Sequence, residues 1–476
     1  FGATGADRAA RHLRAARDYL AAGDVARARA AAERAVEHDP YDVDAVDLAS
    51  GLAIDHGDVD GVAGMLTRLL TAKADRVPAA QIAPRAGLSY RLGHARAQRG
   101  DLRQAATAYE RAIAIAPGSD GAIQARRGLV ELLRAADDPA KREAIALHLQ
   151  AITAATGGLG DLVAWADELR RQNVADAGRA TLDLALACGH VAEVHQRAFL
   201  SIHTPYVLRD DEAFKVALDA DRALIRDPEE SGLGQVAVAL SEAAALLWPD
   251  LDEALARNDA AGANRIPATR NTPATAMFSR IATALGAGAV MLYERDGGPD
   301  VTVVNAATPV IVLGSRMLAA ATPTAEVRAI LTRAIELTRP EHAAFAGLPI
   351  ADATRLVASV VRLFGPGPLR DAANPLVADP DVQRGHDEMV RAALSVKTRT
   401  RLEQLLAVVS PAVLDVRRYR AACERSADRA ALLLDGNPRT VASLAAARGE
   451  GHEHLISAIA HPQWLPLRTR LGLGVR

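Results

Sequence analysis

The chain is poor in aromatic residues, in cysteine and in lysine. Phe, Trp and Tyr make up 3% of its 476 residues, and lysine is rare among its 56 basic residues. The two cysteines, Cys188 and Cys423, are too few for a disulfide framework or a zinc knuckle, so we expect two free thiols. A net charge of −2, without a basic stripe that carries interleaved aromatics, argues against nucleic-acid binding.

Long hydrophobic runs are also missing. A membrane-spanning helix needs roughly 20 apolar residues, and the longest run, Val236–Trp248, is interrupted by Ser241 and Glu242. No signal peptide is visible, which favours a cytoplasmic location. The chain begins at Phe1 and not at methionine, so a removed signal or further repeats before it stay open.

What the chain does contain is small apolar side chains. Half of it is hydrophobic, and much of that half is alanine, the best helix former. We therefore predict a mainly α fold, and the length suggests two to four domains. Glycine-rich phosphate loops, a dinucleotide-binding fingerprint and a nucleophile elbow are absent from the sequence, and we expect no cofactor.

The N-terminal part contains an internal repeat. Tyr19–Pro40 and Ala95–Pro117 both read as a helix, a Gly-Asp turn, a second helix and a proline, and a third Gly-Asp turn begins at Gly57, 34 residues after the first. This pattern resembles the tetratricopeptide repeat, whose period is 34. It predicts an α-solenoid over residues 1–200, clearest at 9–42 and 86–119 and degenerate at 120–200.

Small and special residues support the repeat. Glycine in each Gly-Asp turn permits a positive φ after the first helix. Ala28 and Ala105 occupy the position where the paired helices cross, and Pro40 and Pro117 stop the second helix.

Stacked helix pairs of this kind build a concave surface that holds peptide or protein segments. The first-helix positions that face this surface are predicted to include Arg17, Tyr90, His94 and Gln98. The alternative is that these residues are ordinary solvated surface and that the array chiefly supports a neighbouring domain.

After a connecting region at 201–230, the composition changes. The β-branched runs Val301–Val304 and Val310–Leu313 predict two strands, and Asn305–Pro309 between them predicts a turn. A small sheet flanked by helices, hence an α+β domain, is predicted over residues 231–476.

Four segments in order make this domain similar to the HtpX/CaaX-protease type of gluzincin metallopeptidase. Asn305-Ala306 is followed by "VIVLGSRML", then by a helix over "TAEVRAILTRAIELTRPEH", and then by "ERSAD", which begins at Glu424 and ends at Asp428. In that family the helix carries two histidines that bind zinc and a glutamate that acts as general base, and the later glutamate is a further zinc ligand.

The chemistry of that family is replaced here. The His, Glu and His positions fall on Arg333, Ala334 and Leu337. Arginine stays protonated and leucine has no lone pair, so the resemblance implies an inactive peptidase homologue without a metal. We hypothesise that the Arg333 guanidinium pairs with Glu424 in place of the lost cation.

Two segments resemble zinc motifs and lack a ligand. His452–Ile456 has Ile456 at the second histidine position, and Thr338–His342 has Thr338 at the first, with Pro340 breaking the helix. We expect the histidines His452, His454 and His461 to be surface residues.

The sequence therefore predicts a non-catalytic protein-binding scaffold, adaptor or assembly factor with partners of unknown identity. Two alternatives remain: a zinc-dependent peptidase with a non-standard site, and a domain that holds peptides without cleaving them.

Overall fold

The fold is mainly α-helical with one small sheet, which confirms the predicted fold class. The computed structural model describes residues 4–70, 82–203, 221–230, 232–267, 269–288, 290–297, 300–319, 325–377, 379–435, 437–471 and 473. Of the predicted connecting region, residues 204–220 lie outside this description. No described helix combines the length and the apolar character needed to cross a membrane.

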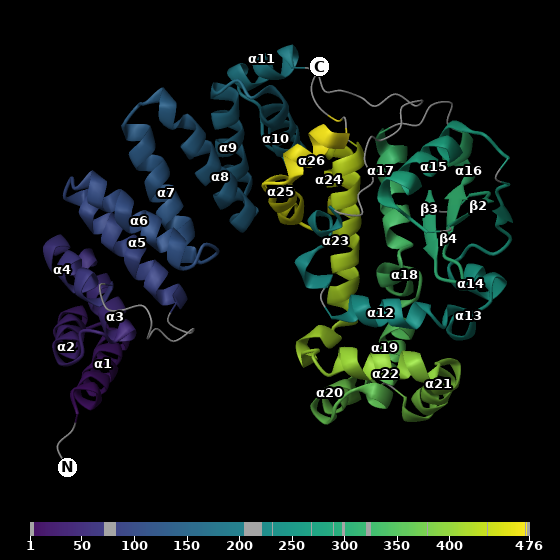
Figure 1. Cartoon of the computed structure of the whole chain (residues 1–476), viewed down its shortest axis with the longest axis horizontal. Coiled ribbons are helices and arrows are strands. Elements are labelled where there is room, and N and C mark those ends of the chain that lie inside the picture. The colour runs from purple at the N-terminus through teal and green to yellow at the C-terminus, as the bar shows by residue number, and fades with distance from the viewer. Residues whose placement is uncertain are drawn as a thin grey trace. The chain divides into compact units, whose positions relative to one another are not determined.

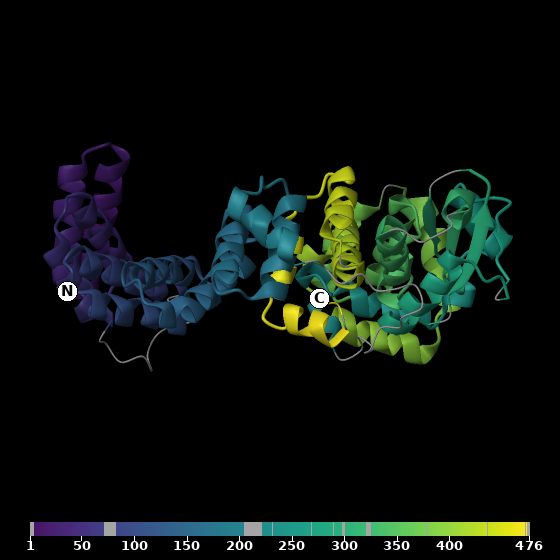
Figure 2. The same ribbon diagram turned by 90° about the horizontal axis from the view of Figure 1, so that it is seen from above.

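The chain forms two compact units. The first comprises residues 1–156 and 160–172, and the second comprises residues 157–159 and 173–476. In Figures 1 and 2 the helices of the first unit, coloured purple to blue, follow one another in chain order. These helices are α1 (Gly5–Ala21), α2 (Val25–His38), α3 (Val43–Asp55), α4 (Val59–Leu70), α5 (Ile82–Gln98), α6 (Leu102–Ile115), α7 (Asp120–Ala135), α8 (Arg142–Thr156) and α9 (Leu159–Arg171).

The Gly-Asp turns between paired helices have the predicted geometry. Gly23, Gly57 and Gly100 adopt φ values of 76°, 75° and 82°, which suit glycine and few other residues. The alanines at the predicted crossings, Ala28 and Ala105, are fully buried. A larger side chain at either position would push the two helices of its pair apart.

Tyr109 of α6 fixes the distance between three helices of the first unit. A methyl group added at Gly93 of α5 would lie 2.5 Å from the Tyr109 ring, and one added at Gly128 of α7 would lie 2.6 Å from it. The ring is almost fully buried and stacks on Tyr90, with ring centroids 6.0 Å apart. Both glycines are therefore required by packing.

We predict that Gly93→Ala lowers the free energy of unfolding by about 1–3 kcal/mol, because the added methyl overpacks the site. Gly64→Ala in α4 is the matched control. Nothing lies within 4 Å of the methyl it would add, so the better helix propensity of alanine should stabilise the protein by up to about 1 kcal/mol. Urea denaturation of both variants checks the difference, and equal effects would contradict the packing argument.

The second unit begins before the predicted end of the repeats. Helices α10 (Ala175–Ala187) and α11 (Val194–Ile202) fall within the predicted degenerate repeats, yet α10 packs against α24 (Pro438–Ala447). Their contacts therefore assign α10 and α11 to the second unit.

The sheet of the second unit has four strands in the order β1-β2-β4-β3. The strands are β1 (Asn264–Arg265), β2 (Met291–Arg295), β3 (Val301–Val304) and β4 (Val310–Gly314). β2 and β4 run parallel, and the other pairs are antiparallel. The two predicted strands are confirmed as β3 and β4, joined by the predicted turn. Val310–Leu313 is buried throughout because β4 is a central strand.

Helices surround this sheet and form a separate cluster beside it (Figure 1). The remaining elements are the 3₁₀ turns η3 (Pro139–Lys141), η4 (Arg222–Leu224), η5 (Pro228–Glu230), η6 (Asn374–Leu376) and η7 (Pro411–Leu414), and the helices α12 (Leu233–Ser241), α13 (Ala244–Leu247), α14 (Leu251–Arg257), α15 (Pro273–Leu285), α16 (Ser315–Ala319), α17 (Ala325–Leu337), α18 (Pro340–Ala346), α19 (Ile350–Phe364), α20 (Gly367–Ala373), α21 (Pro380–Ala393), α22 (Val396–Leu406), α23 (Val416–Asp435), α25 (Glu453–Ile459) and α26 (Trp464–Leu471). Helix α17 packs against α15 on one side and against α23 on the other. This packing brings together the two sequence segments that resemble a peptidase site.

Candidate functional site

Helix α17 ends where the sequence predicts a break. It stops at Leu337, and α18 begins at Pro340 after Arg339 takes an extended conformation. Proline cannot supply the backbone donor that an uninterrupted helix would need there. Arg333, Ala334 and Leu337 therefore lie in the last turns of α17.

The predicted ion pair between Arg333 and Glu424 is present. The Nη2 atom of Arg333 donates to Glu424, and its Nε donates to Asp428 Oδ1 at 2.6 Å. Glu424 and Asp428 are four residues apart on α23 and so share one face of that helix. A single guanidinium thus bridges both carboxylates of the "ERSAD" segment.

Asp428 is the centre of this cluster. Its side chain is fully buried, and it also accepts hydrogen bonds from Arg448 and from His454, whose Nε2 lies 3.1 Å away. Burial would raise the pKa of Asp428, but the contacts with His454, Arg333 and Arg448 outweigh this effect and lower it. The carboxylate is therefore held in its charged form.

His454 corrects one prediction. The expectation that it is a surface residue is wrong, because it is 8% exposed and bonded to Asp428. His454 is buried because α25 packs against α23. The spacing of residues in the sequence does not reveal this packing, so the burial could not be predicted.

The other two positions singled out by the resemblance are apolar and buried. Ala334 is 1% exposed, and Leu337 belongs to the core cluster that also contains Cys423 and Ala427 of α23. None of these side chains except the thiol offers a donor to a cation, and burial raises the pKa of the Cys423 thiol. Within the described part of the chain, no group of three or more His, Cys, Asp or Glu residues is arranged to hold a metal ion.

Both cysteines are free thiols, as predicted. Cys423 is buried in the core, and Cys188 is partly exposed. Burial raises the pKa of Cys188 to about 12, so this thiol stays protonated at neutral pH.

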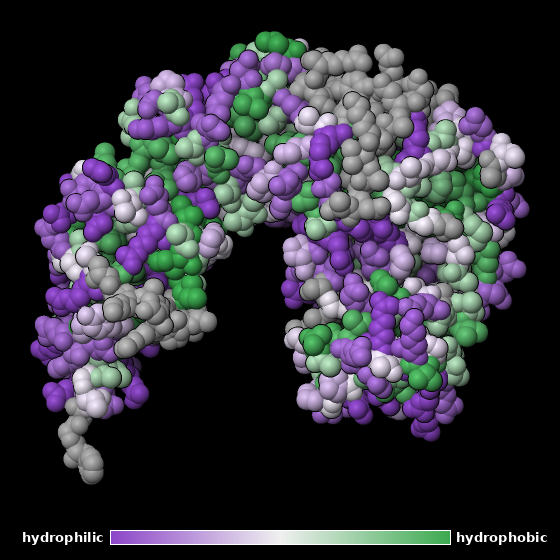
Figure 3. All heavy atoms as spheres, in the orientation of Figure 1, coloured by the Kyte–Doolittle hydropathy of each residue, from purple (hydrophilic) through white to green (hydrophobic). Residues whose placement is uncertain are grey.

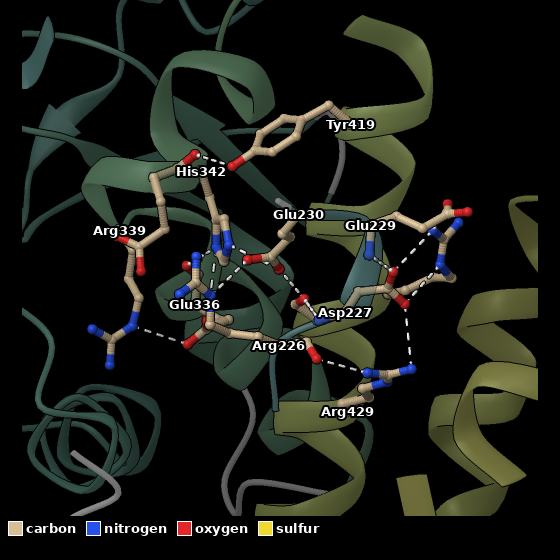
Figure 4. A network of polar contacts seen from close by, with 12 residues as sticks. Arg226, Asp227, Glu229, Glu230, Glu336, Arg339, His342, Tyr419 and Arg429 are labelled. Atoms are coloured by element: carbon tan, nitrogen blue, oxygen red, sulfur yellow. Dashed lines mark hydrogen bonds and ion pairs between the residues drawn. The ribbon is translucent and has the colours of Figure 1, made fainter. Parts of the chain in front are cut away.

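A second polar network, next to the first, was not predicted. It joins residues 221–230 to α17, α18 and α23 (Figure 4). Arg222 makes two hydrogen bonds to Glu336, at 2.6 and 3.2 Å, and one to Glu341 at 3.1 Å. The sequence shows "RDPEE" only as a charged loop, because the partners of these charges lie more than 100 residues further along the chain.

The acidic end of this segment binds a row of arginines on α23. Asp227 accepts hydrogen bonds from Arg425 at 3.0 and 3.2 Å, and Arg429 lies 3.3 Å from it. Glu229 accepts from Arg418 and Arg425, each at 2.6 Å. Since the arginines recur at helical spacing, they face the segment together.

His342 lies at the centre of this network and is fully buried. Its Nε2 atom is 3.1 Å from Glu230 Oε1, and its Nδ1 is 3.0 Å from the backbone oxygen of Glu336. Burial alone would lower the pKa of His342, but Glu230 and Glu336 outweigh it and raise the pKa. Burial likewise opposes ionisation of Glu230, yet His342, Ser426 and Arg226 hold its pKa at about 2.

We predict that stability falls as the pH rises above about 6.5, the ordinary pKa of histidine. A raised folded pKa means that the contribution of His342 is fully present below that value and is lost as the pH passes the folded pKa. The slope can reach about 1.4 kcal/mol per pH unit for one proton. Urea denaturation from pH 6 to 9 measures it.

His342→Gln is the control, because glutamine does not titrate. This variant should show a flatter profile over the same range, and equal slopes would contradict the assignment. The low pKa of Glu230 reports the acid side of the same pair, whose stability is lost as the pH falls from about 4.5 towards about 2.

The predicted partner-binding residues of the first unit occupy two places. Arg17 of α1 pairs with Asp44 of α3 at 2.8 Å, and both side chains are largely exposed. Tyr90, His94 and Gln98 follow one another along α5, with Tyr90 beside His94 and Gln98 Nε2 3.1 Å from His94 Nε2. The structure thus gathers three of the four residues into one strip.

A cavity of about 210 Å³ lies between the β3–β4 turn, the segment before β2, the end of α12 and the start of α18. Asn305 and Ala306, the Asn-Ala pair of the resemblance, both line it. Asn305 is 2% exposed, and its Nδ2 has no hydrogen-bond partner among the described residues. A buried amide donor without an acceptor is costly, so this group is suited to a ligand carbonyl.

Comparison of the sequence with protein-family models and with curated proteins gives no match. Function is therefore inferred from the site.

Proposed function

We propose that this protein is a non-catalytic scaffold, adaptor or assembly factor. It binds protein partners through tetratricopeptide-like helix pairs and through a degenerate domain like an HtpX/CaaX-protease-type metallopeptidase. We expect its partners to be proteins, and we expect it to use no cofactor.

The observation that carries the proposal is the occupant of the first ligand position. Arg333 places a permanent cation between Glu424 and Asp428, where the resemblance implies a metal. A guanidinium that bridges two carboxylates satisfies their charge without a metal. Leu337, at the second ligand position, is an apolar residue buried in the core cluster that also contains Cys423 and Ala427 of α23.

Two surfaces support binding of a protein partner. The strip of Tyr90, His94 and Gln98 combines an aromatic ring with polar groups, as binding surfaces often do. On α11, Val194 is 74% exposed and Ile202 72% exposed, and green hydrophobic atoms gather there in Figure 3. Exposed apolar patches are typical of interaction sites.

Affinity purification from native cells, followed by mass spectrometry, tests the proposal. We predict that a variant carrying Tyr90→Ala, His94→Ala and Gln98→Ala loses partners that the unaltered chain captures, by at least about tenfold. Arg8→Ala, an exposed change elsewhere on the first unit, is the control. Stoichiometric zinc in the purified protein, together with peptidase activity that is lost in Glu424→Ala, would overturn the proposal.

A second candidate function is to hold peptides without cleaving them. It is favoured by the cavity beside Asn305 and by the position of β3 at the edge of the sheet, where an extended peptide can add as a strand. In this case Asn305→Ala weakens capture of an extended peptide. Asn258→Ala does not, because the Asn258 amide is already bonded to Ala254 and Gly347.

A further inference from the structure

A second cavity, among the helices that follow α18, shares no lining residue with either polar network. It measures about 410 Å³ and is walled by α19, η6, the first turn of α21 and the first turn of α23. Sites for small ligands commonly start at about 300 Å³. Its lining divides into an apolar part and a charged part.

The apolar part is formed by Ile350, Leu376 and Val382. Ile350 and Leu376 are partly buried and pack against the main hydrophobic core of the second unit. Val382 is 51% exposed. An aliphatic group in the cavity would remove this apolar surface from water, which is favourable in proportion to the area covered.

The charged part has two guanidiniums and one carboxylate. Arg417 has no hydrogen-bond or ion-pair partner among the described residues. The Arg355 guanidinium donates one hydrogen bond to Asp352, at 2.8 Å, and its remaining N–H groups can still donate to a ligand. The carboxylate, Asp379, already accepts the backbone N–H groups of the first turn of α21. The cavity therefore has unused capacity for an anion.

Gln383 adds a neutral acceptor. It is 3% exposed, and its Nε2 lies 2.6 Å from Ser359 Oγ and 2.9 Å from Asp387 Oδ1. These contacts hold the nitrogen side of the amide against Ser359 of α19 and Asp387 of α21. The Oε1 atom accepts no hydrogen bond from a described residue, and Gln383 is one of the residues that line the cavity. A ligand N–H would satisfy it.

We propose that this cavity binds the α-carboxylate end of an aliphatic amino-acid unit. The carboxylate pairs with Arg417 and Arg355, and the neighbouring N–H donates to Gln383. The side chain covers the apolar wall at Val382. A free amino acid and the C-terminus of a peptide share this chemistry, and the proposal does not depend on the function proposed above.

Isothermal titration of the full chain tests it with three probes: L-leucine, the tripeptide Gly-Gly-Leu, and the C-terminal amide of that tripeptide. At least one of the two probes with a free carboxylate, L-leucine and Gly-Gly-Leu, should bind. The tripeptide amide should bind at least about tenfold more weakly than the probe that binds, since a charged hydrogen bond is lost. Binding of leucine alone identifies a free amino acid as the source, and binding of the tripeptide alone identifies a peptide C-terminus.

Arg417→Ala should weaken binding by about tenfold or more. This side chain is exposed, and no described residue forms a hydrogen bond or ion pair with it. Val382→Asp places a negative charge near the negatively charged ligand carboxylate, so this variant should weaken binding to a similar extent. Arg384→Ala, on α21 but outside the cavity, should leave it unchanged. Equal binding of acid and amide, unchanged binding by Arg417→Ala, or no binding of either carboxylate at millimolar concentration would overturn the proposal.

Discussion

Replacing Arg333 with alanine is expected to lower the free energy of unfolding by about 3 kcal/mol. The side chain is 13% exposed and bonds to Glu424 and to the fully buried Asp428. Removal leaves two carboxylates near each other with one cation fewer, and a buried charge without its partner is costly. Urea denaturation followed by circular dichroism measures the loss.

The matched control is Arg316→Ala. Arg316 also binds a carboxylate, that of Asp300, but its side chain is 76% exposed. Exposed ion pairs are typically worth less than about 1 kcal/mol. If both variants lose the same stability, the Arg333 cluster does not hold α17 against α23.

A triple variant, Arg333→His, Ala334→Glu and Leu337→His, is expected to bind about one zinc ion per chain. Positions four residues apart share one face of α17, and Arg333 already contacts Glu424 on α23. The two new histidines and Glu424 would supply three protein ligands of a gluzincin site. Elemental analysis after dialysis gives the zinc content, and zinc should raise the melting temperature, because a ligand that binds only the folded state stabilises it.

The control for the triple variant adds Glu424→Gln, which should weaken zinc binding by roughly 10–100-fold or more through loss of a charged ligand. Circular dichroism of each variant establishes that it is folded. A folded triple variant without zinc would contradict the alignment of Arg333, Ala334 and Leu337 with the metallopeptidase motif.

Local structure could be predicted from the amino-acid sequence alone. Alanine content and the Gly-Asp turns predicted helix pairs, because helix propensity and a positive φ are properties of single residues and their neighbours. The β-branched runs that became β3 and β4 could be read for the same reason, as could the end of α17 before Pro340. The contact between Arg333 and Glu424 could be predicted only through the resemblance to a peptidase motif, which relates two helices that lie far apart in the sequence.

The pairing of charged residues that lie far apart along the chain depends on tertiary packing and could not be predicted from the sequence. Glu230 and His342 are more than 100 residues apart, and Asp428 and His454 lie on helices whose packing no spacing in the sequence reveals. Ionised groups are accepted in the interior when partners from other helices compensate their desolvation. The cavity with Arg417 and Gln383 likewise exists because α19, α21 and α23 pack together, which depends on long-range contacts and not on local sequence.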